Sequence, residues 1–177
     1  MADDQSKIER IAKTIKSFPD FPKPGILFKD IFPLLHDPAV FSDLVDVMTN
    51  NVRQLNVDVV IGLDARGFLF GPIIAYQLNI PFVPIRKKGK LPGPTMAVEY
   101  KLEYGSDIFE AQLQSIKEGQ RVVIVDDLLA TGGTMSAACE LVEKMKGNIV
   151  ECLVIIELND LNGRSKITGK VHSLVQC

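Results

Sequence analysis

The sequence has few of the residues that build metal sites. It contains two histidines and three cysteines, and Cys139, Cys152 and Cys177 are odd in number and widely spaced. No pair of them has the short spacing of zinc ligands, and both histidines are isolated in the sequence. Cys139 and Cys152 fall in apolar segments. We therefore expect them to be buried free thiols.

Net charge and long apolar runs are also scarce. Twenty Lys and Arg residues face 22 Asp and Glu residues, a formal net charge of −2, so no overall field draws the chain to nucleic acid or to a membrane. No apolar run approaches the roughly 20 residues of a membrane span. The first seven residues are polar and acidic, unlike a targeting peptide. We expect a cytoplasmic protein with neither nucleic acid nor membrane as a partner.

The chain also has no internal repeat and no linker-like segment. Its 177 residues suit one domain with a substantial core. Apolar strand patterns alternate with helical patterns along the whole length. This alternation predicts an α/β fold with a parallel, doubly wound sheet flanked by helices.

The most informative stretch runs from Arg121 to Thr134. Its apolar run, Val122–Val125, predicts a strand buried on both faces. Asp126 and Asp127 follow where that strand ends. After two leucines the chain reads Ala-Thr-Gly-Gly-Thr, and a helical pattern then begins at Met135. The stretch predicts a strand, a tight polar turn and a helix.

Such a turn can bind phosphate, because the first amides of a helix lack internal partners and the helix dipole makes that end positive. Within Thr131–Thr134, the glycines allow close approach of the backbone and the threonines add hydroxyl donors. Asp126 and Asp127 could accept hydrogen bonds from vicinal hydroxyls or from metal-bound water. A sugar phosphate fits both halves. The alternative is an ordinary turn with solvated aspartates.

The turn is neither a Walker A loop, since no Gly-Lys-Ser/Thr follows, nor a dinucleotide fingerprint. A second polar turn, Asp64–Gly67, follows the predicted strand Val57–Leu63, which points to the ligand crevice of an open α/β sheet. Arg66 could hold a second anionic group there or form a salt bridge. The basic segment Lys87–Thr95 is either a solvated run or a loop that closes over a polyanion.

Elsewhere the patterns predict the remaining elements. Three prolines in Phe18–Gly25 predict a rigid turn without helix or ladder, which is either packed by its own aromatics or a ligand-binding edge. Phe109, Leu113 and Ile116 indicate a short helix. Other helices are expected through Ile8–Ile15, from Pro38 to Leu55, through Ile73–Leu78 and over 134–146. Other strands are expected over 81–86, 96–104, 150–156 and 171–175, with a polar loop over 159–169.

Five segments together resemble the type I phosphoribosyltransferases, and among them the enzymes that use adenine, over nearly the whole chain. They are Ser17–Gly25, Gly62–Pro72, Arg86–Thr95, Leu102–Gly105 and Val125–Thr134. The resemblance implies the reaction of adenine with 5-phosphoribosyl pyrophosphate (PRPP) to give AMP and pyrophosphate, with Mg²⁺ as cofactor, in purine salvage. It also implies one domain, 1–177, in which residues 1–36 form an N-terminal helix and a small base-binding hood and residues 37–177 form the core.

The resemblance further assigns residues to roles. Glu103 and Arg66 are implied as catalytic residues, with Glu103 in general acid and base work on the purine. Mg²⁺ is implied to bind through PRPP and water, without a direct protein ligand. The implied sites are ribose 5-phosphate at Asp126, Asp127, Ala130, Thr131, Gly132, Gly133 and Thr134, pyrophosphate at Asp64, Ala65, Arg66, Arg86, Lys87 and Lys90, and adenine at Leu27, Phe28 and Lys29.

Three further expectations come from the resemblance. The Asp64–Gly67 turn should have an unusual peptide geometry, the protein should be a homodimer, and Arg86 is a candidate to reach the pyrophosphate of a neighbouring subunit. Two positions depart from the family pattern, which often has Ser at the place of Ala65 and Arg at that of Lys29. Loss of the serine hydroxyl should weaken PRPP binding modestly. Replacement of the family's arginine by Lys29 matters little if backbone groups bind the base, and it affects base affinity if the arginine guanidinium normally stacks on the base.

Two alternatives remain open. One is a phosphoribosyltransferase for another base, and the other is a PRPP-sensing regulator without catalysis. Against the regulator stand the complete basic loop, Glu103 and the lack of a DNA-binding segment.

Overall fold

The structure, a computed structural model, describes residues 2–102 and 105–177. The chain divides into two compact units, one up to Asn51 and the other from Val52 to Cys177. The N-terminal unit contains α1 (Ala2–Thr14), β1 (Lys16–Pro19), β2 (Leu27–Asp30), α2 (Phe32–His36) and most of α3 (Pro38–Arg53). The predicted helices at Ile8–Ile15 and from Pro38 are confirmed, whereas α2 was not predicted.

The N-terminal unit carries a hairpin of exposed apolar residues. β1 and β2 pair antiparallel, with Phe18 opposite Phe28, and Phe21 packs edge-on against Phe28 at 5.1 Å between ring centroids. The prediction that no ladder forms in Phe18–Gly25 is wrong for its first residues, since Pro19 pairs with Leu27. Both strands of a two-stranded sheet are edge strands, where proline is tolerated.

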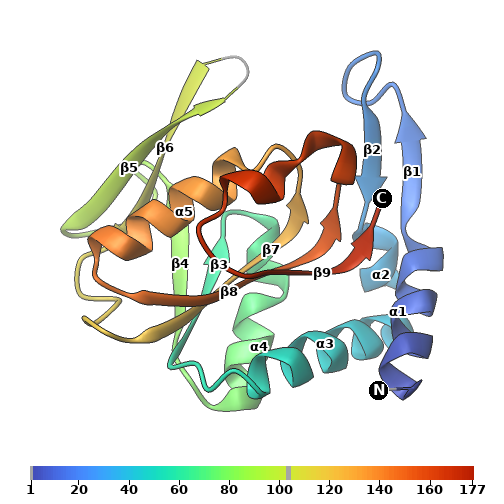
Figure 1. The fold of residues 1–177 in the computed structure, drawn as a ribbon, viewed down its shortest axis with the longest axis horizontal. Coiled ribbons are helices and arrows are strands. Elements are labelled where there is room, and N and C mark those ends of the chain that lie inside the picture. The colour runs from blue at the N-terminus through green and yellow to red at the C-terminus, as the bar shows by residue number, and fades with distance from the viewer. Residues whose placement is uncertain (1, 103–104) are drawn as a thin grey trace. The chain divides into compact units, whose positions relative to one another are not determined.

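The second unit is built on a seven-stranded sheet with the order β5-β6-β4-β3-β7-β8-β9. β4, β3, β7, β8 and β9 run parallel, and the β5–β6 hairpin joins the β4 edge antiparallel and extends away from it (Figure 1). The strands are β3 (Val59–Leu63), β4 (Phe82–Lys87), β5 (Thr95–Leu102), β6 (Gly105–Gln112), β7 (Arg121–Leu129), β8 (Asn148–Glu157) and β9 (Val171–Gln176).

Helices cover both faces of the parallel part of this sheet. They are α4 (Gly71–Leu78) and α5 (Gly133–Lys144), with 3-10 turns η1 (Arg66–Leu69), η2 (Asn159–Leu161) and η3 (Gly163–Lys166). Ile61 and Leu63 of β3 lie in the core cluster under α5, whereas Gly62 between them lies against Gly71 of α4. Successive strand residues point to opposite faces, so the two helices lie on opposite sides. The predicted α/β architecture with a parallel, helix-flanked sheet is confirmed.

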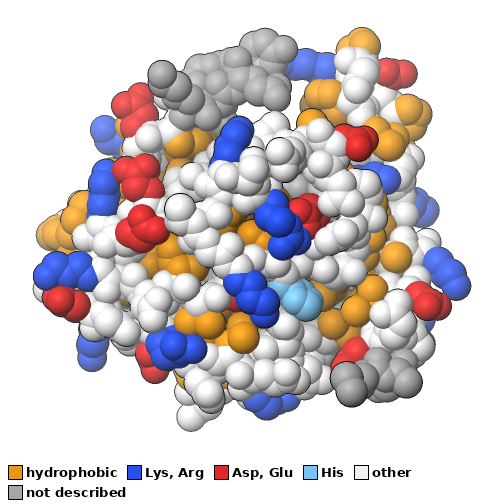
Figure 2. All heavy atoms as spheres, in the orientation of Figure 1, with side chains coloured by type: hydrophobic (Ala, Val, Ile, Leu, Met, Phe, Trp, Pro, Cys, Tyr) orange, Lys and Arg blue, Asp and Glu red, His pale blue; other side chains and the backbone are white. Residues whose placement is uncertain are grey.

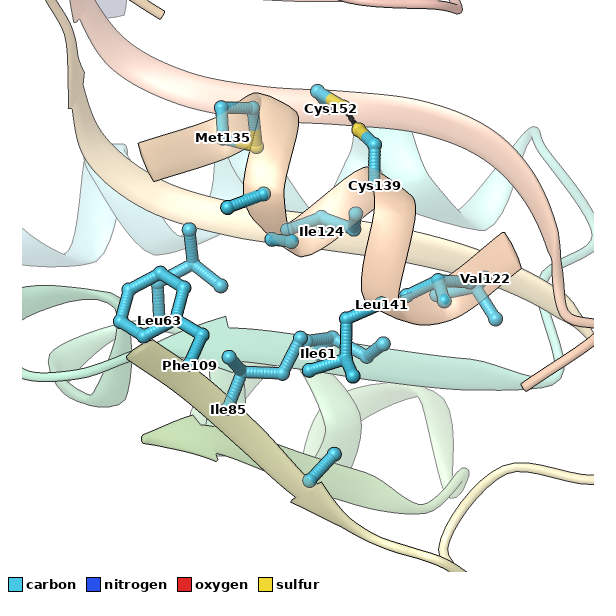
Figure 3. Packing of buried hydrophobic residues seen from close by; sticks show 14 of the residues in the cluster. Ile61, Leu63, Ile85, Phe109, Val122, Ile124, Met135, Cys139, Leu141 and Cys152 are labelled. Atoms are coloured by element: carbon cyan, nitrogen blue, oxygen red, sulfur yellow. Dashed lines mark hydrogen bonds between the residues drawn. The ribbon is translucent and has the colours of Figure 1, made fainter. Parts of the chain in front are cut away.

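The core under α5 packs this helix against β3, β7 and β8. Leu141 of α5 points toward Ile61 of β3, and Ile124 of β7 lies beside them (Figure 3). Cys139 of α5 and Cys152 of β8 are buried free thiols with their sulfurs 3.6 Å apart, as expected from the sequence. The prediction of a short helix at Phe109–Ile116 is wrong, because Phe109 belongs to β6 and pairs with Val98.

Charged side chains of both signs lie on the face of the molecule shown in Figure 2, where Lys and Arg are interspersed with Asp and Glu. Among the helices that the structure describes, none combines the length and the apolar character needed to cross a membrane.

Candidate active site

Two polar turns meet at one edge of the parallel sheet. β3 and β7 are neighbours in register, with Gly62 opposite Val125, so the turns that follow them emerge side by side. Residues 64–66 and 126–135 line a cavity of about 240 Å³ between these turns. This is the crevice at the carboxyl ends of the strands, where open α/β sheets bind ligands.

One wall of the cavity is the turn before α5. Gly132 has φ 80° and ψ −4°, a left-handed conformation that other residues rarely adopt, and it ends the turn at the helix start. The amide of Ser136 donates to the Gly132 carbonyl at 2.9 Å, the first bond of the helix. The amides of Gly133, Thr134 and Met135 precede that bond, so no helix carbonyl is in register with them. They offer hydrogen-bond donors to an anion.

The rest of the lining carries the carboxylate pair and a cation. Arg66 lies 3.0 Å from Oδ2 of Asp127, whose side chain is 4% exposed. Removal from water and the neighbouring Asp127 carboxylate raise the pKa of Asp126 well above its ordinary value. Burial also raises the pKa of Asp127, and the Arg66 guanidinium opposes that rise. A ligand that brings hydroxyl donors or a cation to this wall would stabilise both carboxylates in their ionised form.

The turn after β3 is held from the next strand. Arg86 of β4 donates from Nε to Oδ2 of Asp64 at 2.9 Å, and its guanidinium lies 5.8 Å from the Phe68 ring centroid. The peptide bond between Asp64 and Ala65 is cis, an unusual geometry of the kind that the resemblance implies for this turn. The expectation that Arg86 reaches the pyrophosphate of a neighbouring subunit stays a prediction.

The basic segment after β4 is tied back to β6. Glu110, which is 5% exposed, accepts hydrogen bonds from the amides of Lys90 and Leu91, both at 3.1 Å, and from the Thr95 hydroxyl at 3.3 Å. Gln112 of the same strand donates to the Pro92 carbonyl at 3.0 Å. Sequence reasoning missed Glu110, because a carboxylate between apolar neighbours gives no sign that it will accept bonds from a loop 20 residues earlier.

The structure brings most of the predicted anion-binding residues together. Ten of them line the one cavity, namely Asp64, Ala65, Arg66, Asp126, Asp127, Ala130, Thr131, Gly132, Gly133 and Thr134. Leu128, Leu129 and Met135 line it as well, and the sequence reasoning had not assigned them to it.

Lys87, Lys90 and the predicted adenine-binding residues are not among those that line this cavity. Lys87 forms an ion pair with Asp107 at 2.7 Å, which raises the pKa of Lys87, and the side chain of Lys90 is exposed. Leu27, Phe28 and Lys29 form β2 of the N-terminal unit. Glu103 lies outside the described residues.

The carboxylates at the cavity suit a hard divalent cation that keeps its water. Among the residues that the structure describes, no group of three or more His, Cys, Asp or Glu side chains is arranged to hold a metal ion. Asp126 and Asp127 are adjacent, and one of them is already paired with Arg66. Mg²⁺ typically binds through one or two carboxylates together with phosphate oxygens and water, so this donor set fits Mg²⁺ that arrives with a phosphorylated ligand.

Comparison with known sequences shows a single family. A model described as "Phosphoribosyl transferase domain" matches residues 34–174. The adenine phosphoribosyltransferase of Drosophila pseudoobscura pseudoobscura is 51% identical over 174 residues, which cover 97% of this chain and 96% of that protein. The human adenine phosphoribosyltransferase is 48% identical over 170 residues, which cover 94% of this chain and 93% of that protein.

Solved structures agree. The adenine phosphoribosyltransferase of Saccharomyces cerevisiae, complexed with D-2,5-dideoxy-2,5-imino-altritol 1,6-bisphosphate and adenine, superposes with a TM-score of 0.93 at 42% identity, covering 96% of this chain and 98% of that chain. The enzyme of Giardia lamblia, complexed with 9-deazaadenine, gives a TM-score of 0.89 at 34% identity, covering 96% of this chain and 97% of that chain.

Proposed function

The chain belongs to the phosphoribosyltransferase family, with adenine phosphoribosyltransferases as its relatives, and we propose that it transfers the 5-phosphoribosyl group of PRPP to adenine in purine salvage. The products are AMP and pyrophosphate. The observation that carries this proposal is the shared cavity, whose lining combines helix-start amides with two carboxylates. A ribose phosphate offers an anion to the amides and a diol to the carboxylates, which supports the proposal.

In this proposal each wall binds one part of PRPP. The amides and hydroxyls of Ala130–Thr134 hold the 5-phosphate, and Asp126 with Asp127 accepts hydrogen bonds from the ribose hydroxyls. The Asp64–Arg66 turn contacts the pyrophosphate, and Arg86 supports this turn through its hydrogen bond to Asp64. Lys87 and Lys90 add positive charge when the basic loop closes over the leaving group.

The chemistry follows from where charge develops. Departure of pyrophosphate leaves positive charge on the ribose ring, and the carboxylates of Asp126 and Asp127 stabilise that charge. Arg66 stabilises the departing anion while its contact with Asp127 fixes the guanidinium. Bound Mg²⁺ would neutralise charge on the pyrophosphate oxygens. Glu103 moves a proton at the purine ring in this scheme, which is the role that the resemblance implies.

The base site and the assembly remain proposals of the same kind. Leu27, Phe28 and Lys29 would bind adenine through backbone groups and ring stacking, and a Phe28→Ala variant should then raise KM for adenine but not for PRPP.

The homodimer and the cytoplasmic location stay predictions. Size-exclusion chromatography with light scattering tests the dimer, and cell fractionation tests the location.

An assay of base specificity tests the proposed function. The purified chain is supplied with Mg²⁺, PRPP and adenine, guanine, hypoxanthine or xanthine in separate reactions, followed by absorbance and by release of pyrophosphate. We expect turnover with adenine and at least about 10⁴-fold less with the oxopurines, because their donors and acceptors would be left unpaired in an adenine pocket. Turnover with another base instead of adenine, or PRPP binding without any turnover, would support the two alternatives and contradict the proposal.

A further inference from the structure

A segment distant in sequence packs directly on the phosphate-binding turn. A Cβ atom placed on Gly163 would lie 2.1 Å from the Ala130 carbonyl oxygen and 2.8 Å from the Gly132 amide nitrogen. In the other direction, a Cβ on Gly132 would lie 2.3 Å from the Gly163 carbonyl oxygen. These distances are shorter than normal van der Waals contacts, so neither position has room for a Cβ atom. The backbones of the two segments are therefore in direct contact.

The same segment is fixed to the sheet on its other side. Arg164 donates from Nε to Oε1 of Glu157 at 2.9 Å and from Nη2 to Oε2 of the same carboxylate at 2.5 Å. Its Nη1 donates to the Val171 carbonyl at 2.7 Å. Glu157 is 5% exposed and also accepts from the Ser173 hydroxyl at 2.7 Å. Bidentate pairing with a planar guanidinium fixes direction as well as distance. Gly163, next to Arg164, therefore has little freedom to retreat from the turn.

The contact brings together the two segments that follow β7 and β8. β7 and β8 pair up to Leu129 and Glu157, and the amide of Leu158 then donates to the Leu129 carbonyl at 2.9 Å. Beyond that bond the two chains separate, one into the phosphate-binding turn and the other into η2. The two segments come into backbone contact again where Gly163 meets Ala130 and Gly132.

We propose that Gly163 is a positioning residue that sets the backbone of the phosphate-binding turn, with Arg164 and Glu157 as its anchor on the sheet. This inference rests on the proposed function, because it assumes that the turn binds the 5-phosphate. Gly163 is not among the residues that line the cavity. It acts by placing the Ala130 carbonyl and the Gly132 amide, and through them the amides that face the cavity.

Gly163→Ala tests this role with a single methyl group. Its φ lies outside the left-handed range, so alanine is acceptable to the local backbone and only the contact with Ala130 and Gly132 changes. We expect Kd for AMP and KM for PRPP to rise roughly tenfold to a hundredfold, the range for misaligning one or two hydrogen bonds to a charged group. KM for adenine should stay within about twofold of its original value, since the base makes no contact with this turn.

Gly147→Ala is the matched control. Its Cβ would meet Val142 Cγ1 at 2.7 Å and Ile116 Cγ2 at 3.2 Å, beyond the opposite end of α5 from the phosphate-binding turn. It should lower the melting temperature through core crowding and leave Kd for AMP unchanged. A structural role alone would move stability in both variants and AMP affinity in neither.

Arg164→Lys provides an independent test of the same role if Gly163→Ala does not fold. Lysine keeps the positive charge but not the bidentate geometry, so we expect a smaller rise in Kd for AMP with the same unchanged KM for adenine. Wild-type affinity for AMP in a folded Gly163→Ala protein, or in folded Arg164→Lys if the first variant is insoluble, would overturn the inference. Absence of AMP binding to the unmodified chain would instead overturn the proposed function.

Discussion

The Arg66 guanidinium lies 3.0 Å from Oδ2 of Asp127, and this contact joins the turn after β3 to the end of β7 in the lining of the cavity. Asp127 is almost completely buried, whereas Arg66 is one-third exposed. The pair therefore connects the proposed pyrophosphate wall to the proposed ribose wall, and it compensates a carboxylate that has little access to water.

Arg66→Ala should affect both activity and stability. Loss of the cation leaves the buried Asp127 carboxylate uncompensated, which we expect to cost about 1–3 kcal/mol of unfolding free energy, less than for a fully buried pair because Arg66 is partly exposed. kcat/KM for PRPP should fall by roughly 10²-fold or more, through loss of charge stabilisation on the leaving group. Urea denaturation and steady-state kinetics measure the two effects.

Lys146→Ala is the control for that variant. Lys146 forms an ion pair with Glu118 at 2.8 Å, with both side chains about 70% exposed. Removing this cation should change stability by no more than about 0.5 kcal/mol and leave kinetics unchanged. Equal effects of the two variants would contradict the role assigned to Arg66.

Asp126→Asn should stabilise the ligand-free protein while it lowers activity. The raised pKa of Asp126 means that the folded state binds more protons than the unfolded state between the two pKa values, so this group lowers stability as pH rises through that window. Asparagine removes the charge and keeps the oxygen that accepts the Asp127 amide. We expect a melting temperature a few degrees higher at pH 7, with the gain shrinking as pH falls toward the ordinary value for Asp. A pH-independent difference, or a loss at pH 7, would contradict the assigned cause.

Glu110 should control the basic loop. Glu110→Ala removes the acceptor for the Lys90 and Leu91 amides and the Thr95 hydroxyl, so the loop should open and trypsin should cut faster after Lys88 and Lys90. Glu110→Gln keeps an acceptor oxygen and should be cut at close to the original rate. Time courses of limited proteolysis, read by mass spectrometry, separate the variants. Identical cleavage of all three proteins would show that Glu110 does not hold the loop.

Glu103 should act in the chemical step. Glu103→Ala or Glu103→Leu is expected to lower kcat by roughly 10²–10⁴-fold, with smaller changes in KM, because general acid and base work takes place only in the transition state. Glu99→Ala provides the comparison, since Glu99 is an exposed carboxylate of β5 that accepts a hydrogen bond from the Ser106 hydroxyl. Unchanged kcat in the Glu103 variants would remove its assigned role.

Sequence reasoning succeeded where the signal was local. The order of an apolar strand, two aspartates and a glycine turn lies within Val122–Thr134, and the structure places its polar part in one cavity. β6 was mistaken for a helix because Phe109, Leu113 and Ile116 match helical spacing, while the buried Glu110 hides the alternation of the strand. Only pairing with β5 decides between the two periods.

The contact of Gly163 with the phosphate-binding turn could not be predicted in the same way. A glycine in the polar loop 159–169 has the same local appearance whether it faces solvent or contacts the backbone of Ala130 and Gly132. Likewise, Arg164 can contact both Glu157 of β8 and Val171 of β9 only because these strands are neighbours, which no local pattern specifies.

Calorimetric titration of the purified chain with PRPP and with AMP, in the presence of Mg²⁺, tests the central claim most directly. The account predicts saturable binding of one ligand per chain in both cases, with adenosine, which lacks the phosphate, binding far more weakly than AMP. A folded chain that binds neither PRPP nor AMP, or that binds adenosine as tightly as AMP, would contradict a phosphate site at Ala130–Thr134.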